Sequence, residues 1–313
     1  MKNGGAVKVT RRKKKSWDDW VFDIACAAIL IILVAAVIYP IYYILIASFS
    51  DPIYATIGKP LLYPKGINFE GYKMVLQEKR LWMGYGNTIF YTVVGTTIGV
   101  MICMMAGYAF SRKDLPGGSF LMKLYVFTMY FGGGMIPTFL VVKNLGLLDT
   151  RAVMIILGSV SVYNIIVIRA TLQSSIPDEL YEAALMDGCR NTKFFLQIVL
   201  PLSKAIIAVM VLYIAVGYWN SYMNGVLYLT DGQKYPLQMI LNQILQSTNM
   251  GGKISAGDMG TTAELMKMQE ENMKKVQLIK YGIIVVSSAP IICVYPFIQK
   301  YFIKGVMIGS VKG

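Results

Sequence analysis

Histidine is absent from this 313-residue chain, and charged residues make up only 15% of it. Without imidazole groups the chain cannot build a histidine-based catalytic triad, a histidine metal site or a histidine proton relay. A soluble globular chain contains about 25% charged and about 45–50% apolar residues, whereas this one is 56% hydrophobic. The composition therefore indicates a chain solvated by lipid.

Cysteine is also scarce. Cys26, Cys103 and Cys293 fall inside apolar runs, and Cys189 lies in a polar loop. This spacing matches neither a zinc site nor a small secreted disulfide fold, so we interpret the four residues as free thiols. The chain also lacks the GxxxxGK[ST] loop that binds nucleotide phosphates. We expect it to bind no metal and no cofactor, and to hydrolyse no ATP by itself.

Six long uncharged runs organise the sequence. They are Ile24–Phe49, Asn87–Ser111, Leu124–Val142, Ala152–Ile168, Ala205–Thr230 and Tyr281–Gln299. A bilayer core of about 30 Å needs about 20 helical residues, and no soluble core of this chain length would hold six such helices. We predict an all-α polytopic membrane protein with six transmembrane helices. The first run is too long for a signal peptide and is predicted to remain uncleaved.

The basic residues favour one orientation. The chain has 30 Lys and Arg against 17 Asp and Glu, a formal net charge of +13, and five of the basic residues form the run 11–15. With both termini in the cytoplasm, 17 Lys and Arg lie inside and 13 outside, in agreement with the positive-inside rule. The positive charge suits an anionic lipid surface, and no nucleic acid is expected as a partner.

These runs divide the chain into segments. The predicted segments are a basic cytoplasmic tail (1–20), a first transmembrane helix (21–49), an extracellular loop (50–86), a core of five transmembrane helices (87–304) that includes a cytoplasmic loop (169–204) and a second extracellular loop (231–280), and a cytoplasmic tail (305–313). In the first extracellular loop the apolar spacing predicts an amphipathic helix from Phe69 to Met83. The second is predicted to hold a charged helix from Thr262 to Lys275, and such long loops are usually functional.

The cytoplasmic loop has the pattern of two short helices at a sharp angle. Ser175 is a plausible N-cap of the first helix, Pro177 suits its first turn, and Gly188 can end it in a left-handed conformation. Asn191 or Thr192 could cap the second helix. Its apolar side is predicted to contain Phe194, Phe195, Ile198 and Val199. Pro201 is expected to close this helix and open the fifth span.

This loop resembles a known motif. Glu182-Ala183-Ala184, three residues, Gly188, nine residues and Ile198-Val199-Leu200-Pro201 reproduce the EAA loop of bacterial ATP-binding-cassette (ABC) importer permeases. The resemblance implies that this loop contacts an ATPase and couples ATP hydrolysis to transport. The residues expected to form the coupling site are Glu182, Ala183, Ala184, Asp187, Gly188, Ile198, Leu200 and Pro201. Glu182 could pair with a basic residue of the ATPase, or with Arg190 or Lys193 nearby.

Other segments resemble the carbohydrate-uptake permeases. They are Gly86–Ile89, Ser111–Lys113, Gly132–Thr138, Ala215–Asn220 and Lys234–Gln238. Together they are similar to the six-span partner of a maltose-type permease pair, closest to its oligosaccharide-importing branch in Gram-positive bacteria. The resemblance implies the type I ABC importer permease fold. Gly132-Gly133-Gly134 could allow a close helix crossing or a break in the third span, and we favour the packing role.

The resemblance also implies partners. We expect a heterodimer with a second permease, a separate ATPase dimer that holds ATP and magnesium, and an extracellular solute-binding lipoprotein. The substrate would be a carbohydrate, and the location would be the plasma membrane of a bacterium, with the chain crossing it several times.

Polar and aromatic residues within two of the spans are candidates for the substrate path, because sugars bind to aromatic faces and to hydrogen-bonding side chains. The candidates are Tyr163, Asn164, Tyr218, Trp219, Asn220, Tyr222 and Asn224. The alternative is that these aromatic residues belong to an interfacial belt and that the asparagines bridge helices.

Three other functions remain open at this stage. A permease of the same superfamily could carry amino acids, peptides or metals, since the EAA loop does not distinguish among these solutes. An ion-coupled secondary transporter or a channel is disfavoured, because its spans would be expected to contain charged residues. An intramembrane enzyme is disfavoured further by the lack of a nucleophile–base pair.

Overall fold

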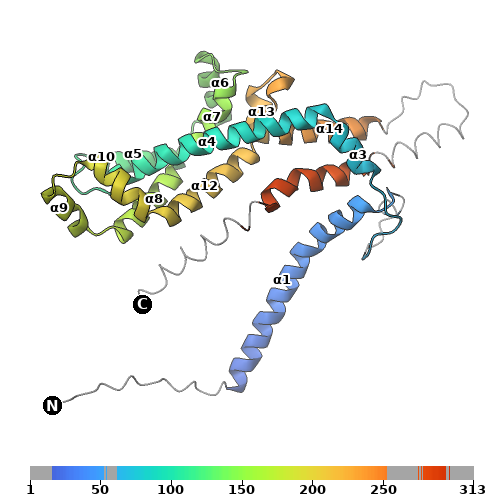
Figure 1. The fold of residues 1–313 in the computed structure, drawn as a ribbon, viewed down its shortest axis with the longest axis horizontal. Coiled ribbons are helices and arrows are strands. Elements are labelled where there is room, and N and C mark those ends of the chain that lie inside the picture. Colours follow the sequence, from blue (N-terminus) through green and yellow to red (C-terminus); the bar gives the residue numbers. More distant parts are fainter. Residues whose placement is uncertain are drawn as a thin grey trace, which may run out of the picture. The chain divides into compact units, whose positions relative to one another are not determined.

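The computed structural model describes residues 16–52, 54, 62–251, 274, 276, 278–293 and 296, with only the backbone for 247–251. All regular secondary structure in these residues is helical, which confirms the predicted all-α class. The chain divides into two compact units, Met1–Phe69 and Glu70–Gly313. Figure 1 shows the helices of each unit.

The described part of the first unit is dominated by α1 (Trp17–Phe49). Asp18 and Asp19 lie in its first turn, where the helix dipole favours negative charge. Nearly all of its apolar side chains are exposed, and burial begins only at Ile46. A helix that is apolar on every side is typical of a membrane span. The first predicted span is therefore a helix that is long and apolar enough to cross a membrane.

The second unit begins with α3 (Glu70–Gln77) and α4 (Lys79–Ser111). The predicted amphipathic helix is α3, and it ends at Gln77 instead of Met83. Glu78 then caps α4, because its side chain accepts a hydrogen bond from the Arg80 amide at 3.3 Å. As a result, α4 starts at Lys79, before the predicted start at Asn87. Residues 81–86 are uncharged and belong to the same run, so the predicted start at Asn87 was too late, and only Lys79 and Arg80 lie beyond the uncharged run.

The third predicted span is broken. Helices α5 (Gly118–Tyr130) and α6 (Met135–Asn144) meet at 111°. Gly134 has φ +89°, a backbone conformation that favours glycine. A Cβ atom added to Gly132 or Gly134 would meet no atom within 4 Å. The three glycines therefore form the break that the sequence left open as the alternative, and in the described residues the favoured close helix packing is not found at Gly132 or Gly134.

The fourth and fifth predicted spans also consist of separate helices. The fourth is α7 (Arg151–Ser159) followed by α8 (Val162–Ser175), with a bend of 44° between them. The fifth is α12 (Lys204–Trp219), which stops well before Thr230 and is followed by α13 (Tyr222–Tyr228). The Asn220 side chain donates to the Val216 carbonyl at 3.0 Å. Such a side-chain bond competes with the backbone ladder and favours the end of a helix.

The predicted number of spans is confirmed only in part. In the described residues α1 and α4 are long and apolar enough to cross a membrane, and the count rises to five when each bent pair is taken as one span. The last predicted span is described as an apolar helix over Leu278–Cys293. The charged stretch predicted from Thr262 to Lys275 lies almost entirely outside the described residues, as do both chain ends.

Within the second unit, α7, α8 and α12 pack along α4 (Figure 1). Glycines on α4 allow this close approach. A Cβ on Gly99 would lie 2.6 Å from the Ser159 carbonyl oxygen, and one on Gly107 would lie 2.4 Å from Ile168 Cγ2. At one end of α4 lie α9 (Asp178–Met186) and α10 (Asn191–Phe194), and at the other lies α14 (Leu237–Gly251). The candidate sites lie at these two ends.

Candidate functional site

Helix α9 carries the Glu-Ala-Ala part of the predicted coupling site. It begins after Pro177, whereas Ser175 belongs to the last turn of α8, so the predicted N-cap at Ser175 is wrong. The physical reason is that a residue before proline is driven to extended geometry, and Ile176 has φ −120° and ψ 103°. At the other end Gly188 has φ +72°, which confirms the predicted left-handed cap.

The two faces of α9 differ. Only Tyr181 and Ala184 are buried among its residues. Glu182, Ala183, Asp187 and Gly188 are exposed, together with Leu185 and Met186, and Met186 is 89% exposed. Among the described residues Glu182 forms no ion pair with Arg190 or Lys193. The exposed face of α9 therefore offers a carboxylate and two apolar side chains to a partner.

The second helix of the loop is one continuous run. It consists of α10, a π-helix η1 (Phe195–Val199) and α11 (Leu200–Leu202). Phe194 and Val199 are buried, and Phe195 and Ile198 pack against the same core, which confirms the predicted apolar side. The predicted capping by Asn191 or Thr192 is wrong, because Arg190 holds the N-cap position. Asn191 Oδ1 instead accepts a hydrogen bond from the Tyr181 hydroxyl at 2.7 Å.

This run turns sharply into the fifth span. Pro201 does not close the helix, which continues to Leu202. Because proline lacks an N–H donor, the backbone ladder is disturbed next to it, and the π-turn immediately precedes it. The break follows at Ser203, and α12 leaves at 82° to the run. Ile198, Leu200 and Pro201 thus lie between the exposed helix α9 and the start of α12.

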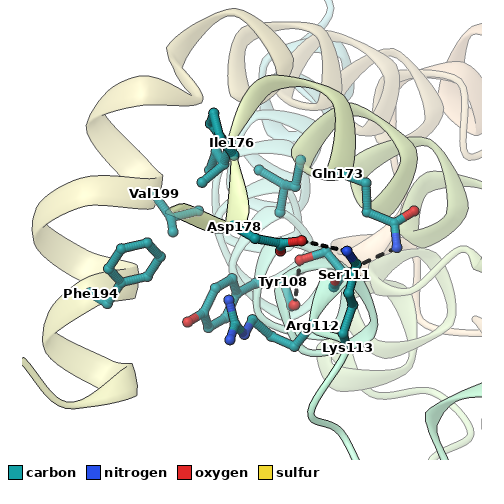
Figure 2. A pocket seen from close by; sticks show the side chains of 11 residues that line it. Tyr108, Ser111, Arg112, Lys113, Gln173, Ile176, Asp178, Phe194 and Val199 are labelled. Atoms are coloured by element: carbon teal, nitrogen blue, oxygen red, sulfur yellow. Dashed lines mark hydrogen bonds and ion pairs between the residues drawn. The ribbon is translucent and has the colours of Figure 1, made fainter. Parts of the chain in front are cut away.

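The end of α4 holds α9 in place. The Arg112 guanidinium lies over the Tyr181 ring, with its Cζ 3.2 Å from the ring centroid. Lys113 Nζ forms an ion pair with Asp178 Oδ2 at 2.5 Å, visible in Figure 2. The hydrogen bond from Lys113 lowers the pKa of Asp178, and the reciprocal bond raises the pKa of Lys113. A cation over an aromatic face contributes about 0.5–2 kcal/mol, depending on burial.

A cavity of about 260 Å³ lies beside this junction. Figure 2 shows Phe194 and Val199 on one side of it, and Asp178 and Lys113 on the other. The Gln173 side chain donates to the Ser111 carbonyl at 3.4 Å across the ends of α8 and α4. The cavity is bounded by the contact of the second helix with α4, where the Tyr108 ring lies 5.1 Å from the Phe195 ring, centroid to centroid.

A second cluster lies at the opposite end of α4, around Asp149. This residue has φ +55°, and its Oδ1 accepts hydrogen bonds from the backbone amides of Thr230 at 3.1 Å and Asp231 at 3.0 Å. Lys234 Nζ donates to Asp149 Oδ2 at 3.1 Å and to its carbonyl at 2.8 Å. The two amides, with a further contribution from Lys234, lower the pKa of Asp149 to about 2.

The same loop is bound to the first turns of α4. Asn87 Nδ2 donates to the carbonyls of Gln233 at 2.7 Å and Tyr235 at 3.1 Å. Thr88 Oγ1 accepts from the Leu237 amide at 2.8 Å, at the start of α14. The segments Gly86–Ile89 and Lys234–Gln238, which stand far apart in the sequence, are thus one structural unit.

The fold and its two ends match known proteins. The family described as "Binding-protein-dependent transport system inner membrane component" matches residues 27–308. The chain belongs to this family. It is the family of the membrane permease subunit of ABC importers, distinct from the ATPase, and its type I permease fold agrees with the prediction. Membership leaves the ion-coupled transporter and the intramembrane enzyme without support.

Several relatives of this permease are named for the transport of saccharides. It is 38% identical to the polygalacturonan/rhamnogalacturonan transport system permease protein YtcP of Bacillus subtilis, over 93% of this chain and 98% of the relative. It is 37% identical to protein LplC of the same organism, over 94% and 95%. A crystal structure of a bacterial ABC transporter involved in the import of the acidic polysaccharide alginate matches with a TM-score of 0.80 and 34% identity, covering 93% of this chain and 99% of that one.

The predicted substrate-path residues of the permease do not form one cluster. Tyr218 is buried, donates to the Ile155 carbonyl and lies 3.3 Å from Ser159 Oγ. Trp219 is buried in the core near Leu237. The other members differ in exposure: Tyr163 and Asn220 are exposed, Tyr222 and Asn224 half-buried, and Asn164 buried. In the described residues no hydrogen bond joins Tyr163 or Asn164 to the α12–α13 group, so the path through these side chains stays a prediction.

Several residues at the two ends were not singled out from the sequence. In the sequence Arg112 stands out only as part of a segment that resembles the family, and Tyr181 has no predicted role. Asp149 carried no signal at all. A basic pair at the end of a span, facing a helix with Asp178 in its first turn, is the only local hint of the inner junction. The contacts themselves join residues far apart in the chain.

Proposed function

We propose that this permease is the membrane subunit of an ATP-driven importer for oligosaccharides. It would form the translocation path with a second permease, receive substrate from an extracellular binding lipoprotein, and contact an ATPase dimer that holds ATP and magnesium. In this proposal the protein sits in the bacterial plasma membrane with both termini in the cytoplasm.

The observation that carries the proposal is the exposed face of α9. Glu182, Asp187 and Gly188 lie exposed there beside Met186, which is 89% exposed. A large apolar side chain held out by an ordered helix is what a protein-docking surface requires. The segment that follows α9 leads through Ser203 into α12, so force applied to the loop has a short route to a membrane helix.

For the substrate we propose an acidic oligosaccharide. YtcP is named for polygalacturonan and rhamnogalacturonan, and the structural relative serves the acidic polysaccharide alginate. A neutral oligosaccharide is the second candidate, supported by a 25% identical relative named for arabinooligosaccharides. These names give no support to the peptide or amino acid alternative.

Uptake by the complete complex in vesicles tests the substrate class. The complex should import an acidic oligosaccharide such as oligogalacturonate and discriminate against a neutral maltooligosaccharide of the same length. Faster uptake of the neutral sugar would identify a neutral oligosaccharide, the second candidate, as the substrate. Uptake of neither sugar, with import of a peptide, would overturn the carbohydrate assignment.

Two matched glycine variants test the coupling loop. Gly188 and Gly117 have φ +72° and +70°, and a Cβ on either would meet no atom within 4 Å. Changing each to alanine should therefore introduce similar backbone strain, about 1 kcal/mol. We expect Gly188→Ala to reduce uptake strongly because it tilts the exposed end of α9, whereas Gly117→Ala should leave uptake near normal at equal protein levels. Equal uptake by the two variants would contradict a coupling role for α9.

A further inference from the structure

The segment Ser111-Arg112-Lys113 matched the family without a role being evident, and the structure gives Arg112 a specific position. Its side chain is 17% exposed, lies flat over Tyr181, and also pairs with Asp114 through Nε at 3.1 Å. Arg112 follows directly after the last residue of α4. It therefore connects the end of a membrane helix to the buried face of α9.

Tyr181 is the point where the pieces of the coupling loop meet. Its hydroxyl donates to Asn191 Oδ1, and its ring packs edge-on against Phe194 with centroids 5.2 Å apart. One face of the ring is taken by Arg112. A displacement of α9 thus reaches α10 through Asn191 and Phe194, and reaches α4 through Arg112.

The other attachment of α9 to the end of α4 is weaker. The Lys113 and Asp178 side chains are 82% and 52% exposed, and ion pairs in water contribute little. The planar guanidinium can stack on an aromatic ring, which the compact ammonium group of lysine does not reproduce. The stacked pair is therefore the stronger of the two charged attachments at this junction, beside the apolar core that Tyr181 and Ala184 share with Met104.

We propose that Arg112 is a positioning residue that fastens α9 to α4, so that a displacement of α9 by the ATPase carries α4 with it. This inference rests on the proposed function. In this proposal the Arg112 side chain transmits the displacement of α9, caused by docking of the ATPase, to α4. Helices α7, α8 and α12 pack along α4.

The test measures sugar uptake and ATP hydrolysis in the complete complex, in vesicles that also contain the binding protein. Arg112→Gln should still assemble and hydrolyse ATP, but uptake per ATP should fall about 10-fold. Arg112→Lys should restore only part of the lost uptake per ATP. Tyr181→Phe keeps the aromatic face and should couple better than Tyr181→Leu. Arg80→Gln, which breaks the exposed pair with Glu78, is the control and should leave the ratio unchanged.

The outcomes separate this inference from the proposed function. If the wild-type complex imported no carbohydrate, the proposed function would fail. If it imported normally and Arg112→Gln kept the wild-type uptake per ATP, only the role of Arg112 would fail. A uniform loss of uptake and ATPase, with the ratio preserved, would also count against it.

A cross-link tests the same idea when Arg112 is left intact. Lys113→Cys and Asp178→Cys are combined in a chain whose four native cysteines are replaced, and a short bismaleimide then joins α4 to α9. Because the two helices are proposed to move together, the cross-linked complex should transport as fast as the untreated one. Loss of uptake after cross-linking would show that the helices separate during transport and would overturn the proposal.

Discussion

We name the two ends of α4 after the proposed orientation, the outer end at Lys79 and the inner end at Ser111, and the two are held in different ways. At the outer end Asn87, Thr88 and Asp149 bind backbone groups of the loop 230–237. At the inner end the Arg112 and Lys113 side chains contact the side chains of Tyr181, Asp114 and Asp178, and the one bond from another helix to a backbone group there among those described is the long one from Gln173 to the Ser111 carbonyl at 3.4 Å. Bonds to the backbone fix the course of a loop, whereas side-chain pairs near water can slide or exchange. The difference agrees with the proposal that the inner end transmits movement while the outer end stays fixed.

The largest effect is expected from Asn87→Leu. The change removes the two hydrogen bonds that Asn87 Nδ2 donates to the carbonyls of Gln233 and Tyr235, and the one that Asn87 Oδ1 accepts from Arg151 at 3.4 Å. We expect a loss of about 2–4 kcal/mol of stability, seen as a lower melting temperature of the purified complex. The same change at Asn220, whose amide bonds only to its own helix, is the control. If the two variant complexes had the same melting temperature, the outer end would not be the more firmly held end of α4.

A smaller effect is expected from Thr88→Val. Valine keeps the shape of the buried Thr88 side chain but cannot accept the hydrogen bond from the Leu237 amide. The cost should be about 1–2 kcal/mol. Thr97→Val on the same helix removes only a bond to the Val93 carbonyl one turn away, and should cost less than about 0.5 kcal/mol. Thermal unfolding of the two complexes compares them directly, and the reverse order would refute the distinction.

The smallest effect concerns two aspartates that each pair with a lysine. Asp149 also accepts two backbone amides, and its pKa is lowered from 3.8 to about 2. Its carboxylate therefore stabilises the fold above pH 4, and this contribution disappears as the pH falls through about 2. At pH 7 we expect Asp149→Asn to melt below wild type, and the gap to close on acidification.

The inner counterpart should behave differently. Asp178 is half exposed, and its pKa is lowered chiefly by one side-chain bond from Lys113. Asp178→Asn should leave the melting temperature at pH 7 without measurable change. A drop as large as that of Asp149→Asn would remove the contrast between the two ends.

Most of the helices could be predicted from the sequence, but their breaks could not. The uncharged runs located α1, α4 and the apolar core because lipid solvation demands long apolar segments. The breaks at Gly134, Ser161 and Asn220 involve uncharged residues, so a criterion based on charge does not register them. They follow from backbone conformation and from local side-chain bonds, which become decisive only in the folded chain.

In the candidate sites, too, features determined by local sequence could be predicted and features determined by long-range packing could not. The end of α9 at Gly188 was predicted, because a left-handed cap is a local property of glycine. The start of α9 was misplaced because the effect of Pro177 on Ile176 was not considered. The stack of Arg112 on Tyr181 and the bonds of Asn87 to the loop 230–237 depend on long-range packing. For Arg112 and Asn87 the sequence showed only that they lie in segments that resemble the family, without the partner that each one binds.

The bend at Ser203 lets the helical run before it act as a lever on α12. The helical run Asn191–Leu202 meets α12 at 82°, close to a right angle. At 1.5 Å per residue this arm is about 18 Å long, so moving its tip by about 3 Å corresponds to a rotation of about 10° at its base. Because the two helices are nearly perpendicular, a small sideways displacement of the first can rotate α12 about its own axis or tilt the end of α12 next to Ser203. A modest stroke at the inner surface is thus geometrically sufficient to reorient a helix across the bilayer.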